Sequence, residues 1–307
     1  MWRVHKSRGA EVNFADRLLS AVEEKQSHVV VGLDPDYASM PPSLRAAHDA
    51  ADYPDEVGRV CACFREFLIG LLEGLADVAV AVKPQLAFFE ALGYRGFRLY
   101  EDVVGHAASL GYLVIADAKR GDIGNTAEAY ARAHLDVVGA DAITVNPYFG
   151  TDGLEPFLRR AREESKGLFV LVKTSNLSSA EIQDLSLETG QTVYQRVGDL
   201  VNGWGAGAVG ERLYSSVGAV VGGTHPRQAA ELRLALPATP LLIPGYGAQG
   251  AKAADLAGVF DSSGSGAVVN SARAILYAYK NRGGQWLDAA RAEAEEMRAA
   301  LWQVARG

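Results

Sequence analysis

The stretch YLVIADAKRGDIGNTAEAY, residues 112–130, decides the fold of this chain, because it has the form of a strand that leads directly into a helix. Tyr112–Ala116 is a short apolar run behind Gly111, and its length and β-forming residues predict a buried strand. Asp117 and Lys119 follow where this strand ends. Because they are two positions apart, their side chains share one face as long as the chain stays extended.

A turn and a helix are predicted after this strand. Gly121 and Gly124 give the backbone the freedom that a tight turn needs. Asn125 stands where a helix N-cap belongs, and Glu128, three residues later, completes the pattern of a capping box. Asp122 lies in the turn and adds a further carboxylate near the strand end.

The charge row formed by Asp117, Lys119 and Asp122 has two interpretations. Two unit charges about 4 Å apart interact by roughly 4 kcal/mol at an effective dielectric constant of about 20. An ordered row therefore holds the ammonium group in place, keeps it protonated and presents a carboxylate that repels an incoming anion. The alternative is a solvated surface ion pair, which contributes about 0–1 kcal/mol. The spacing alone leaves both open.

Composition and net charge argue against a membrane-spanning, a secreted or a nucleic-acid-binding protein. The 307 residues are 49% hydrophobic, which allows a large core, and no apolar run approaches the roughly 18 residues of a membrane span. Residues 1–14 are basic but lack the apolar segment of a signal peptide, so we expect a cytoplasmic protein. The net charge of −7 argues against nucleic-acid binding, and an anionic substrate must therefore be held by local donors.

Cysteines and histidines give no metal site. Cys61 and Cys63 are two apart on a predicted helix, where they point in different directions and are best explained as packing residues. The six histidines show no ligand spacing, and we expect each to lie on the surface or in a loop.

Apolar strands alternate with helices along the whole chain. We expect strands at residues 28–33, 78–82, 112–116, 142–145, 168–172, 217–221, 241–243 and 267–269. We expect helices at 13–26, 54–75, 97–109, 126–138, 154–164, 192–204 and 226–234, a short piece at 253–256 and final helices from 272 onward. Eight βα units favour a closed (β/α)8 TIM barrel, an α/β fold, over an open doubly wound sheet. We expect a single domain over residues 1–307, with extra terminal helices.

Polar residues gather where the expected strands end. Active sites of such barrels lie at the carboxyl ends of the strands. The residues at these ends are Asp34, Lys83, Asp117, Lys119, Asn146, Ser175, Thr224, Gly245 and Asn270.

A glycine-rich loop follows the seventh strand. Residues 244–250, PGYGAQG, let backbone N–H groups approach a phosphate, and the helix expected behind the loop adds to the attraction. Arg273, after the eighth strand, is a fork-shaped cation that suits phosphate oxygens. A plain tight turn is the alternative for the loop alone. Loop and arginine together predict a phosphate site, as is common after strands 7 and 8 of barrels.

Several of these motifs resemble one family. The string from Asp117 to Ile123, DAKRGDI, is similar to the D-x-K-x-x-D-I signature of orotidine 5′-phosphate decarboxylases. The following GNTAEAY, which contains Thr126, resembles the longer, second group of that family. Residues 244–251 resemble its P-G-x-G-A-Q-G-G loop, with Ala251 where a further glycine is usual, and VNSARAI at 269–275 resembles the segment that carries its phosphate arginine.

The resemblance implies decarboxylation of orotidine 5′-monophosphate to uridine 5′-monophosphate and CO2, without cofactor or metal. It implies that Asp117 crowds the substrate carboxylate, that Lys119 stabilises the carbanion and then protonates it, and that Lys83 and Asp122 hold this pair in register. It implies that Asp34 binds the ribose hydroxyls. The remaining implied contacts are Ser175 to the pyrimidine, with Lys173 as a further cation beside it, and Gln249, Gly250 and Arg273 to the phosphate.

The resemblance also implies a homodimer with shared sites. In that family the residues that correspond to Asp122, Ile123 and Thr126 reach into the neighbouring subunit's site. The inserted stretches 35–53 and 177–191 fit the longer group, and the sequence does not indicate their role.

Two other functions remain open at this stage. One is a sugar-phosphate decarboxylase or aldolase of the same superfamily, which shares the D-x-K-x-x-D pattern and uses a divalent metal. The other is a nucleotide-binding barrel without catalysis, because a fold does not fix a function.

Overall fold

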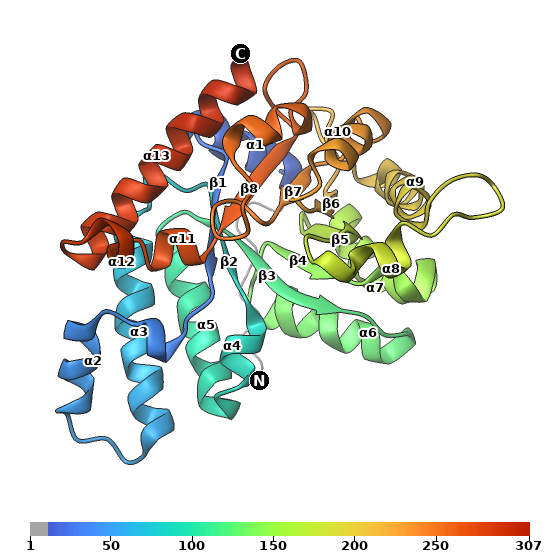
Figure 1. Cartoon of the computed structure of the whole chain (residues 1–307). Coiled ribbons are helices and arrows are strands. Elements are labelled where there is room, and N and C mark those ends of the chain that lie inside the picture. Colours follow the sequence, from blue (N-terminus) through green and yellow to red (C-terminus); the bar gives the residue numbers. More distant parts are fainter. Residues whose placement is uncertain (1–11) are drawn as a thin grey trace.

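A closed barrel of eight parallel strands in chain order forms the centre of the structure, a computed structural model that describes residues 12–307 (Figure 1). The barrel closes where β1 pairs with β8, with Val29 opposite Val269. The predicted (β/α)8 fold is therefore confirmed. The strands are β1 (Val29–Leu33), β2 (Ala81–Pro84), β3 (Leu113–Arg120), β4 (Ala142–Val145), β5 (Gly167–Lys173), β6 (Val217–Val221), β7 (Leu241–Ile243) and β8 (Ala267–Ser271).

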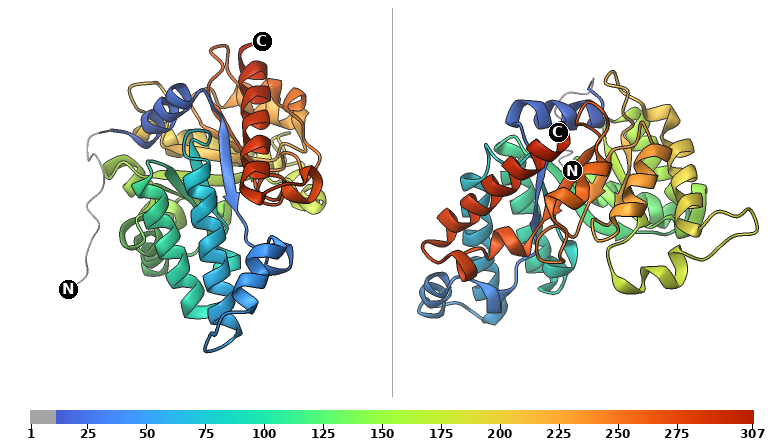
Figure 2. Two further views of the ribbon diagram at one scale, coloured as in Figure 1. Left: turned by 90° about the vertical axis from the view of Figure 1, so that its left-hand side faces the viewer. Right: turned by 45° about the horizontal axis from the view of Figure 1, so that its top comes forward.

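Helices surround the barrel (Figures 1 and 2). A 3-10 helix at Ala253–Val259 takes the place of an α-helix between β7 and β8, and a π-helical turn at Arg132–Val137 extends α6. The α-helices are α1 (Phe14–Lys25), α2 (Pro42–Asp49), α3 (Glu56–Gly74), α4 (Leu86–Glu90), α5 (Gly93–Ser109), α6 (Gly124–Ala131), α7 (Gly150–Glu163), α8 (Ala180–Gln183), α9 (Val193–Gly205), α10 (Pro226–Ala235), α11 (Arg273–Leu276), α12 (Tyr279–Arg282) and α13 (Trp286–Arg306). Within residues 12–307, none of these helices has the length and apolar character to cross a bilayer.

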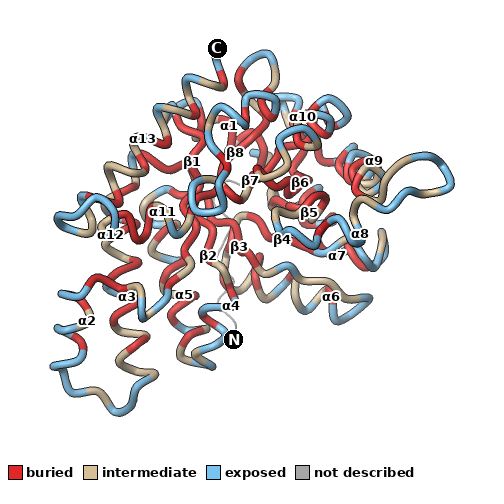
Figure 3. The backbone as a smooth tube through the Cα atoms, in the orientation of Figure 1, coloured by how far each residue is buried: buried red, intermediate tan, exposed pale blue. Residues whose placement is uncertain are grey.

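Buried side chains form two layers because successive strand residues point to opposite faces. Val29 and Val31 belong to the layer between the strands and the outer helices, whereas Val30 belongs to the barrel interior. Phe14 of α1 joins the interior layer and packs edge-on against Phe169, with ring centroids 6.0 Å apart. Helix α1 thus closes the amino-terminal end of the barrel and leaves the other end open, and the buried strands stand out at the centre of Figure 3.

The chain ends in a long amphipathic helix, which is one of the predicted terminal helices. Met297 and Leu301 of α13 are buried in the outer layer. At its start, the Trp286 ring packs on Phe67 of α3, with centroids 5.0 Å apart. This helix therefore covers the side of the barrel next to α3.

The predicted capping box at Asn125 is wrong. Helix α6 begins at Gly124, and Ile123 occupies its N-cap position. Glu128 instead accepts hydrogen bonds from the guanidinium groups of Arg159 and Arg160. These charge-assisted bonds are stronger than a bond to a neutral backbone N–H, so they decide where the Glu128 carboxylate lies.

The prediction that every histidine lies on the surface or in a loop is wrong for His48 in α2 and His134 in the π-helical turn, which are buried in helices. His28 lies in the loop before β1, as predicted, but it is buried there, and His5 lies outside the described residues. His28 packs between the rings of Phe260 and Trp302, with centroids 4.7 and 5.6 Å away. An imidazole that stays neutral behaves as an aromatic core residue, which spacing in the sequence does not reveal.

Candidate active site

A cavity of about 1090 Å³ opens at the carboxyl ends of the strands. Seven predicted site residues line it, and they come from both halves of the chain. These residues are Asp34, Lys83, Asp117, Lys119, Ser175, Gln249 and Arg273. The barrel therefore brings together, at one end, polar residues that are up to 239 positions apart in the sequence, as parallel strands require.

Asp117 is the centre of the charge row. Its Oδ2 atom accepts a hydrogen bond from Lys83 Nζ, and its Oδ1 atom accepts one from Lys119 Nζ at 2.6 Å. Lys83 and Asp117 are both buried, whereas the Lys119 side chain is 44% exposed and borders the cavity. The interpretation of D-x-K as a solvated surface pair is therefore wrong.

Two neutral side chains that the sequence analysis did not assign complete the contacts of this carboxylate. Gln85 Nε2 donates to Asp117 Oδ2 at 3.0 Å, and Thr144 Oγ1 donates to Asp117 Oδ1 at 2.9 Å. Gln85 comes just after β2, two residues beyond Lys83, so its place at a strand end was visible in the sequence. Thr144 lies inside an apolar strand, and no motif marks it.

Asp117 and Lys83 each favour the charged form of the other. Burial by itself raises the pKa of Asp117, but Lys83 and Lys119 outweigh it and hold that pKa far below its usual range. Burial likewise opposes the charge on Lys83, and the carboxylates of Asp117 and Asp34 reverse this and raise the pKa of Lys83. Asp117 and Lys83 thus stay ionised at neutral pH, and the Asp117 carboxylate is fixed between the two lysine side chains.

The backbone at Lys119 departs from the extended form that the sequence predicted. Lys119 has φ of +47°, and the pairing of β3 with β4 shifts register between Ala116 and Arg120. The Lys119 N–H donates to Thr144 Oγ1 at 3.0 Å. A bulge, not simple alternation, therefore aims the lysine at the cavity, and this left-handed conformation costs a residue with a side chain about 1–3 kcal/mol.

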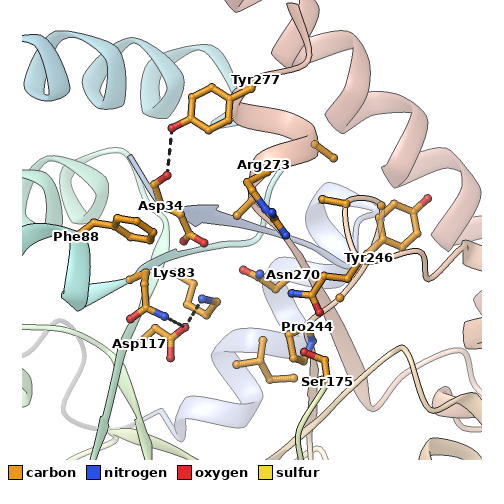
Figure 4. A pocket seen from close by; sticks show the side chains of 18 of the residues that line it. Asp34, Lys83, Phe88, Asp117, Ser175, Pro244, Tyr246, Asn270, Arg273 and Tyr277 are labelled. Carbon is orange, nitrogen blue, oxygen red and sulfur yellow. Dashed lines mark hydrogen bonds and ion pairs between the residues drawn. The ribbon is translucent and has the colours of Figure 1, made fainter. Parts of the chain in front are cut away.

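Asp34 and Asn270 face the cavity from the ends of β1 and β8 (Figure 4). The Asp34 Oδ1 and Asn270 Oδ1 atoms are buried and make no hydrogen bond with the described residues. Burial raises the pKa of Asp34, an effect that Lys83 only partly offsets. Buried polar atoms without a partner are costly in a folded protein, so both are free to bind hydroxyl or amine groups of a ligand.

The glycine-rich loop and Arg273 also line the cavity. The Gly247 N–H bonds to Ala251 O at 3.0 Å and the Gly250 N–H to Gly247 O at 2.8 Å, so these two amides stabilise the turn itself. Gly250 is not among the cavity-lining residues. The short helical piece expected behind the loop is present as the 3-10 helix Ala253–Val259, and its first residue is not among the cavity-lining residues.

Gln249 and Ser175 both lie close to Gly245. A Cβ atom on Gly245 would lie 3.3 Å from Gln249 Oε1 and 3.6 Å from the Ser175 Cβ, and φ there is +102°. Only glycine fits this conformation, because a side chain is strained at such a φ. The loop after β7 and the segment after β5 are therefore in contact at the cavity wall.

Three other residues at strand ends have local roles. Asn146 Oδ1 accepts the Tyr148 N–H at 3.0 Å and caps a 3-10 turn, and Thr224 Oγ1 donates to Ser175 O at 3.1 Å. Lys173, expected as a further cation beside Ser175, is fully buried and binds Asp184 Oδ1 at 2.7 Å instead. Its charge points away from the cavity, because the inserted segment supplies the carboxylate.

Asp122, Ile123 and Thr126 do not line this cavity. Asp122 Oδ1 accepts the N–H of Ile123 at 2.8 Å, and Ile123 is 56% exposed at the rim. The structure therefore does not bring these three residues to the charge row of their own chain. Among the described residues, no group of three or more His, Cys, Asp or Glu side chains is placed to hold a metal ion.

Comparison with known proteins gives one family. Residues 27–284 match the profile of the orotidine 5′-phosphate decarboxylase / HUMPS family. Orotidine 5′-phosphate decarboxylase of Rhodopirellula baltica is 41% identical over 94% of this chain and 99% of its own, and that of Deinococcus radiodurans is 42% identical over 94% and 98%. The solved structure of Leishmania donovani OMP decarboxylase is 30% identical, with a TM-score of 0.74 over 94% of this chain and 99% of that one. The chain therefore belongs to the orotidine 5′-phosphate decarboxylase / HUMPS family.

Proposed function

We propose that this protein decarboxylates orotidine 5′-monophosphate to uridine 5′-monophosphate and CO2 in pyrimidine biosynthesis. The observation that carries the proposal is the buried Asp117 held between Lys83 and Lys119 at the floor of the cavity. A fixed anion beside a partly exposed ammonium group suits a substrate that enters as a carboxylate and leaves the electron pair of the broken bond on its ring carbon.

The chemistry follows from this charge row. Asp117 stays ionised and disfavours the charge of the substrate carboxylate next to it. When the C6–carboxyl bond breaks, its electron pair stays on C6 and CO2 departs. Lys119 neutralises the developing carbanion and donates a proton to C6, after which solvent returns a proton to the lysine. Lys83, Gln85 and Thr144 keep Asp117 in place throughout.

The rest of the cavity binds the nucleotide away from the bond that breaks. Arg273 and Gln249 bind the phosphate, and Gly250 shapes the turn that presents Gln249. Asp34 binds the ribose hydroxyls, and Ser175 contacts the pyrimidine. Binding energy from these remote contacts fixes the base over Lys119, which raises the rate at the reacting carbon.

A direct assay tests the proposal. The purified protein is mixed with orotidine 5′-monophosphate, and the loss of orotate ultraviolet absorbance is followed with and without a chelator. We expect turnover in both. Activity abolished by the chelator and restored by a divalent metal would favour the sugar-phosphate branch of the superfamily, and tight nucleotide binding with no turnover would favour a binding protein.

We also propose a two-fold homodimer with shared sites, in which Asp122, Ile123 and Thr126 complete the partner's cavity. Three facts support it. These residues lie outside their own chain's cavity lining, Ile123 is 56% exposed, and Tyr148, at the neighbouring strand end, is 88% exposed. Exposed large apolar side chains at one rim are typical of a contact surface.

Complementation tests the shared site. Lys119→Ala and Asp122→Ala chains, each nearly inactive alone, are co-expressed and the heterodimer is isolated. One of its sites then carries both lesions and the other neither, so about half of the wild-type activity per dimer should return. An assembled but inactive heterodimer would mean that Asp122 serves its own chain.

We place the enzyme in the cytoplasm and treat the chain as one domain. Cys61 and Cys63 are both free thiols, as is usual in a reducing compartment. The main core cluster runs from Val29 to Ala305 without division. Cell fractionation and a single cooperative unfolding transition would test these two points.

A further inference from the structure

The segment inserted after β5 folds back against the cavity wall. Thr174, Ser175 and Asn176 follow β5 directly and line the cavity. The chain then forms α8 and a loop that is closed by an antiparallel bridge between Ser186 and Thr192. The tip of this loop projects beyond α9 on the right of Figure 1.

The side chain of Gln183, at the end of α8, binds the first residue of the wall. Its Oε1 atom accepts the Thr174 N–H at 2.9 Å, and its Nε2 group donates to Thr174 Oγ1 at 2.8 Å. Thr174 Oγ1 in turn donates to Asn176 Oδ1 at 2.7 Å. The Gln183 amide therefore fixes the backbone and side chain of Thr174, and through the Thr174 hydroxyl it also holds Asn176.

The next residue, Asp184, adds an ion pair with a buried lysine to the same junction. Its Oδ1 atom accepts a hydrogen bond from Lys173 Nζ at 2.7 Å, and the Lys173 side chain has no exposed surface. The same ammonium lies 5.7 Å from the centre of the Tyr194 ring. A lysine buried this deeply needs its carboxylate, so Asp184 is bound firmly at the end of β5.

The barrel holds Ser175 from the other side. The Gly222 N–H bonds to Lys173 O at 2.7 Å, and a Cβ atom on Gly222 would lie 2.7 Å from the Ser175 Cα. Thr224 Oγ1 donates to Ser175 O. Ser175 is therefore enclosed between β6 and the inserted segment, and it cannot shift toward β6.

The inserted segment adds little apolar burial to the core. Leu177, Ile182 and Leu185 are 97%, 67% and 55% exposed, and α8 has no buried residue. Its shortest polar contacts with the barrel are those of Gln183 and Asp184, and the buried Ser179 adds a longer one, from its Oγ atom to His225 Nε2 at 3.5 Å. A segment whose inward-facing groups bind one stretch of the cavity wall acts on that stretch more than on global stability.

We propose that Gln183 and Asp184 are positioning residues that fix Ser175 and so set the affinity of the site for the pyrimidine ring. The inference rests on the proposed function, since it takes the pyrimidine as the group that Ser175 contacts. Loss of either side chain frees residues 174–176 to move outward. Binding of the base then weakens, whereas Arg273 and Gln249, which come from the segments after β8 and β7 and make no hydrogen bond to Gln183 or Asp184, continue to hold the phosphate.

Matched variants test this. Gln183→Ala and Asp184→Asn are compared with Gln191→Ala, which lies in the same insertion and binds Asp199 at 2.7 Å, away from the cavity wall. We expect Gln183→Ala and Asp184→Asn each to lower the affinity for uridine 5′-monophosphate about tenfold, which corresponds to the loss of one or two hydrogen bonds. Their affinity for ribose 5-phosphate should stay unchanged. Gln191→Ala should change neither. Gln183→Glu keeps the acceptor for Thr174 N–H and should restore part of the loss.

Two further measurements make the test decisive. Amide hydrogen exchange in the peptide that contains Thr174–Asn176 should rise in Gln183→Ala and stay unchanged in Gln191→Ala. Adding Gln183→Ala to Ser175→Ala should cost little more uridine 5′-monophosphate affinity than Ser175→Ala alone, because Gln183 acts through Ser175. Unchanged exchange, or equal weakening of nucleotide and ribose 5-phosphate, would overturn the proposal. Absence of orotidine 5′-monophosphate turnover in the wild type would refute the proposed function but not the exchange result.

Discussion

Lys119 combines three properties at the scale of one residue: a left-handed backbone, a hydrogen bond to a buried carboxylate and an exposed flank on the cavity. We expect Lys119→Ala to lose turnover by at least about 10³-fold, because the variant lacks both the proton donor and the charge that stabilises the carbanion. Binding of uridine 5′-monophosphate should change far less. Steady-state kinetics and calorimetry on the same preparation would measure the two effects.

The neighbouring cation supplies the control for this experiment. Arg120 binds Glu90 and lies over the Tyr130 ring at 5.1 Å, outside the cavity lining. Arg120→Gln should keep most of the turnover. A folded Lys119→Ala protein with near-wild-type activity would remove the lysine from the mechanism.

Arg273 should contribute to phosphate binding and little else. A charge-assisted hydrogen bond stabilises a complex by about 1.5–3 kcal/mol, so Arg273→Ala should weaken binding of uridine 5′-monophosphate tenfold or more. The nucleoside uridine lacks the phosphate, and its affinity should stay the same. Titrations with both ligands would measure the two affinities. An equal loss of affinity for uridine 5′-monophosphate and uridine would mean that Arg273 has a structural role.

At the scale of one element, helix α5 contains two glycines in opposite surroundings. A Cβ atom on Gly96 would lie 1.9 Å from Phe89 O, where α4 presses on α5, whereas one on Gly105 would meet nothing within 4 Å. Gly96→Ala should therefore destabilise the protein by at least about 2 kcal/mol through overpacking. Gly105→Ala should stabilise it by roughly 0.5–1 kcal/mol, because alanine favours a helix interior.

Urea unfolding of the two variants would test this contrast, since both change the same residue type in one helix. Equal changes in the free energy of unfolding for the two variants would mean that helix propensity alone determines how α5 responds to alanine. Helix α5 begins at Gly93, four residues before the predicted start at Phe97. The additional turn contains Gly96, which brings α4 and α5 together.

At the scale of the whole molecule, His28 links stability to pH. Burial lowers the pKa of His28 to about 4, although a hydrogen bond with Ala267 O opposes the shift. The unfolded chain has a histidine pKa near 6.5, so below that pH it takes up a proton that the folded chain refuses until about pH 4. This contribution to stability is complete above about pH 6.5 and falls as the pH drops through this window, by about 2 kcal/mol at pH 5.

The difference in unfolding free energy between pH 7.5 and pH 5 measures this effect. In His28→Gln that difference should shrink by about 2 kcal/mol, because the titrating group is gone. His106→Gln, on the outer face of α5, is the control, because it shows how a histidine-to-glutamine substitution at an unburied position changes the pH difference. An unchanged pH difference in His28→Gln would show that the His28 ring titrates alike in the folded and unfolded chains.

The sequence by itself determined the barrel and most of the charged site. Period-2 and period-3.6 patterns are local, so eight βα units could be counted, and their connection rules leave few ways to close a sheet. The strand ends Lys83, Asp117 and Lys119 followed from that count, since every parallel strand ends on the same face. The resemblance of short motifs then added the expected roles of Asp34, Ser175, Gln249 and Arg273.

Only the tertiary structure decided contacts between segments that are distant in the sequence. Thr144 belongs to the site because the bulge in β3 brings Lys119 N–H onto its hydroxyl. Lys173 points away from the cavity because Asp184, eleven residues later, folds back to bind it. His28 is buried because two rings from the end of the chain enclose it. Each outcome depends on which partner reaches a side chain in space, and no pattern confined to one stretch of sequence contains that information.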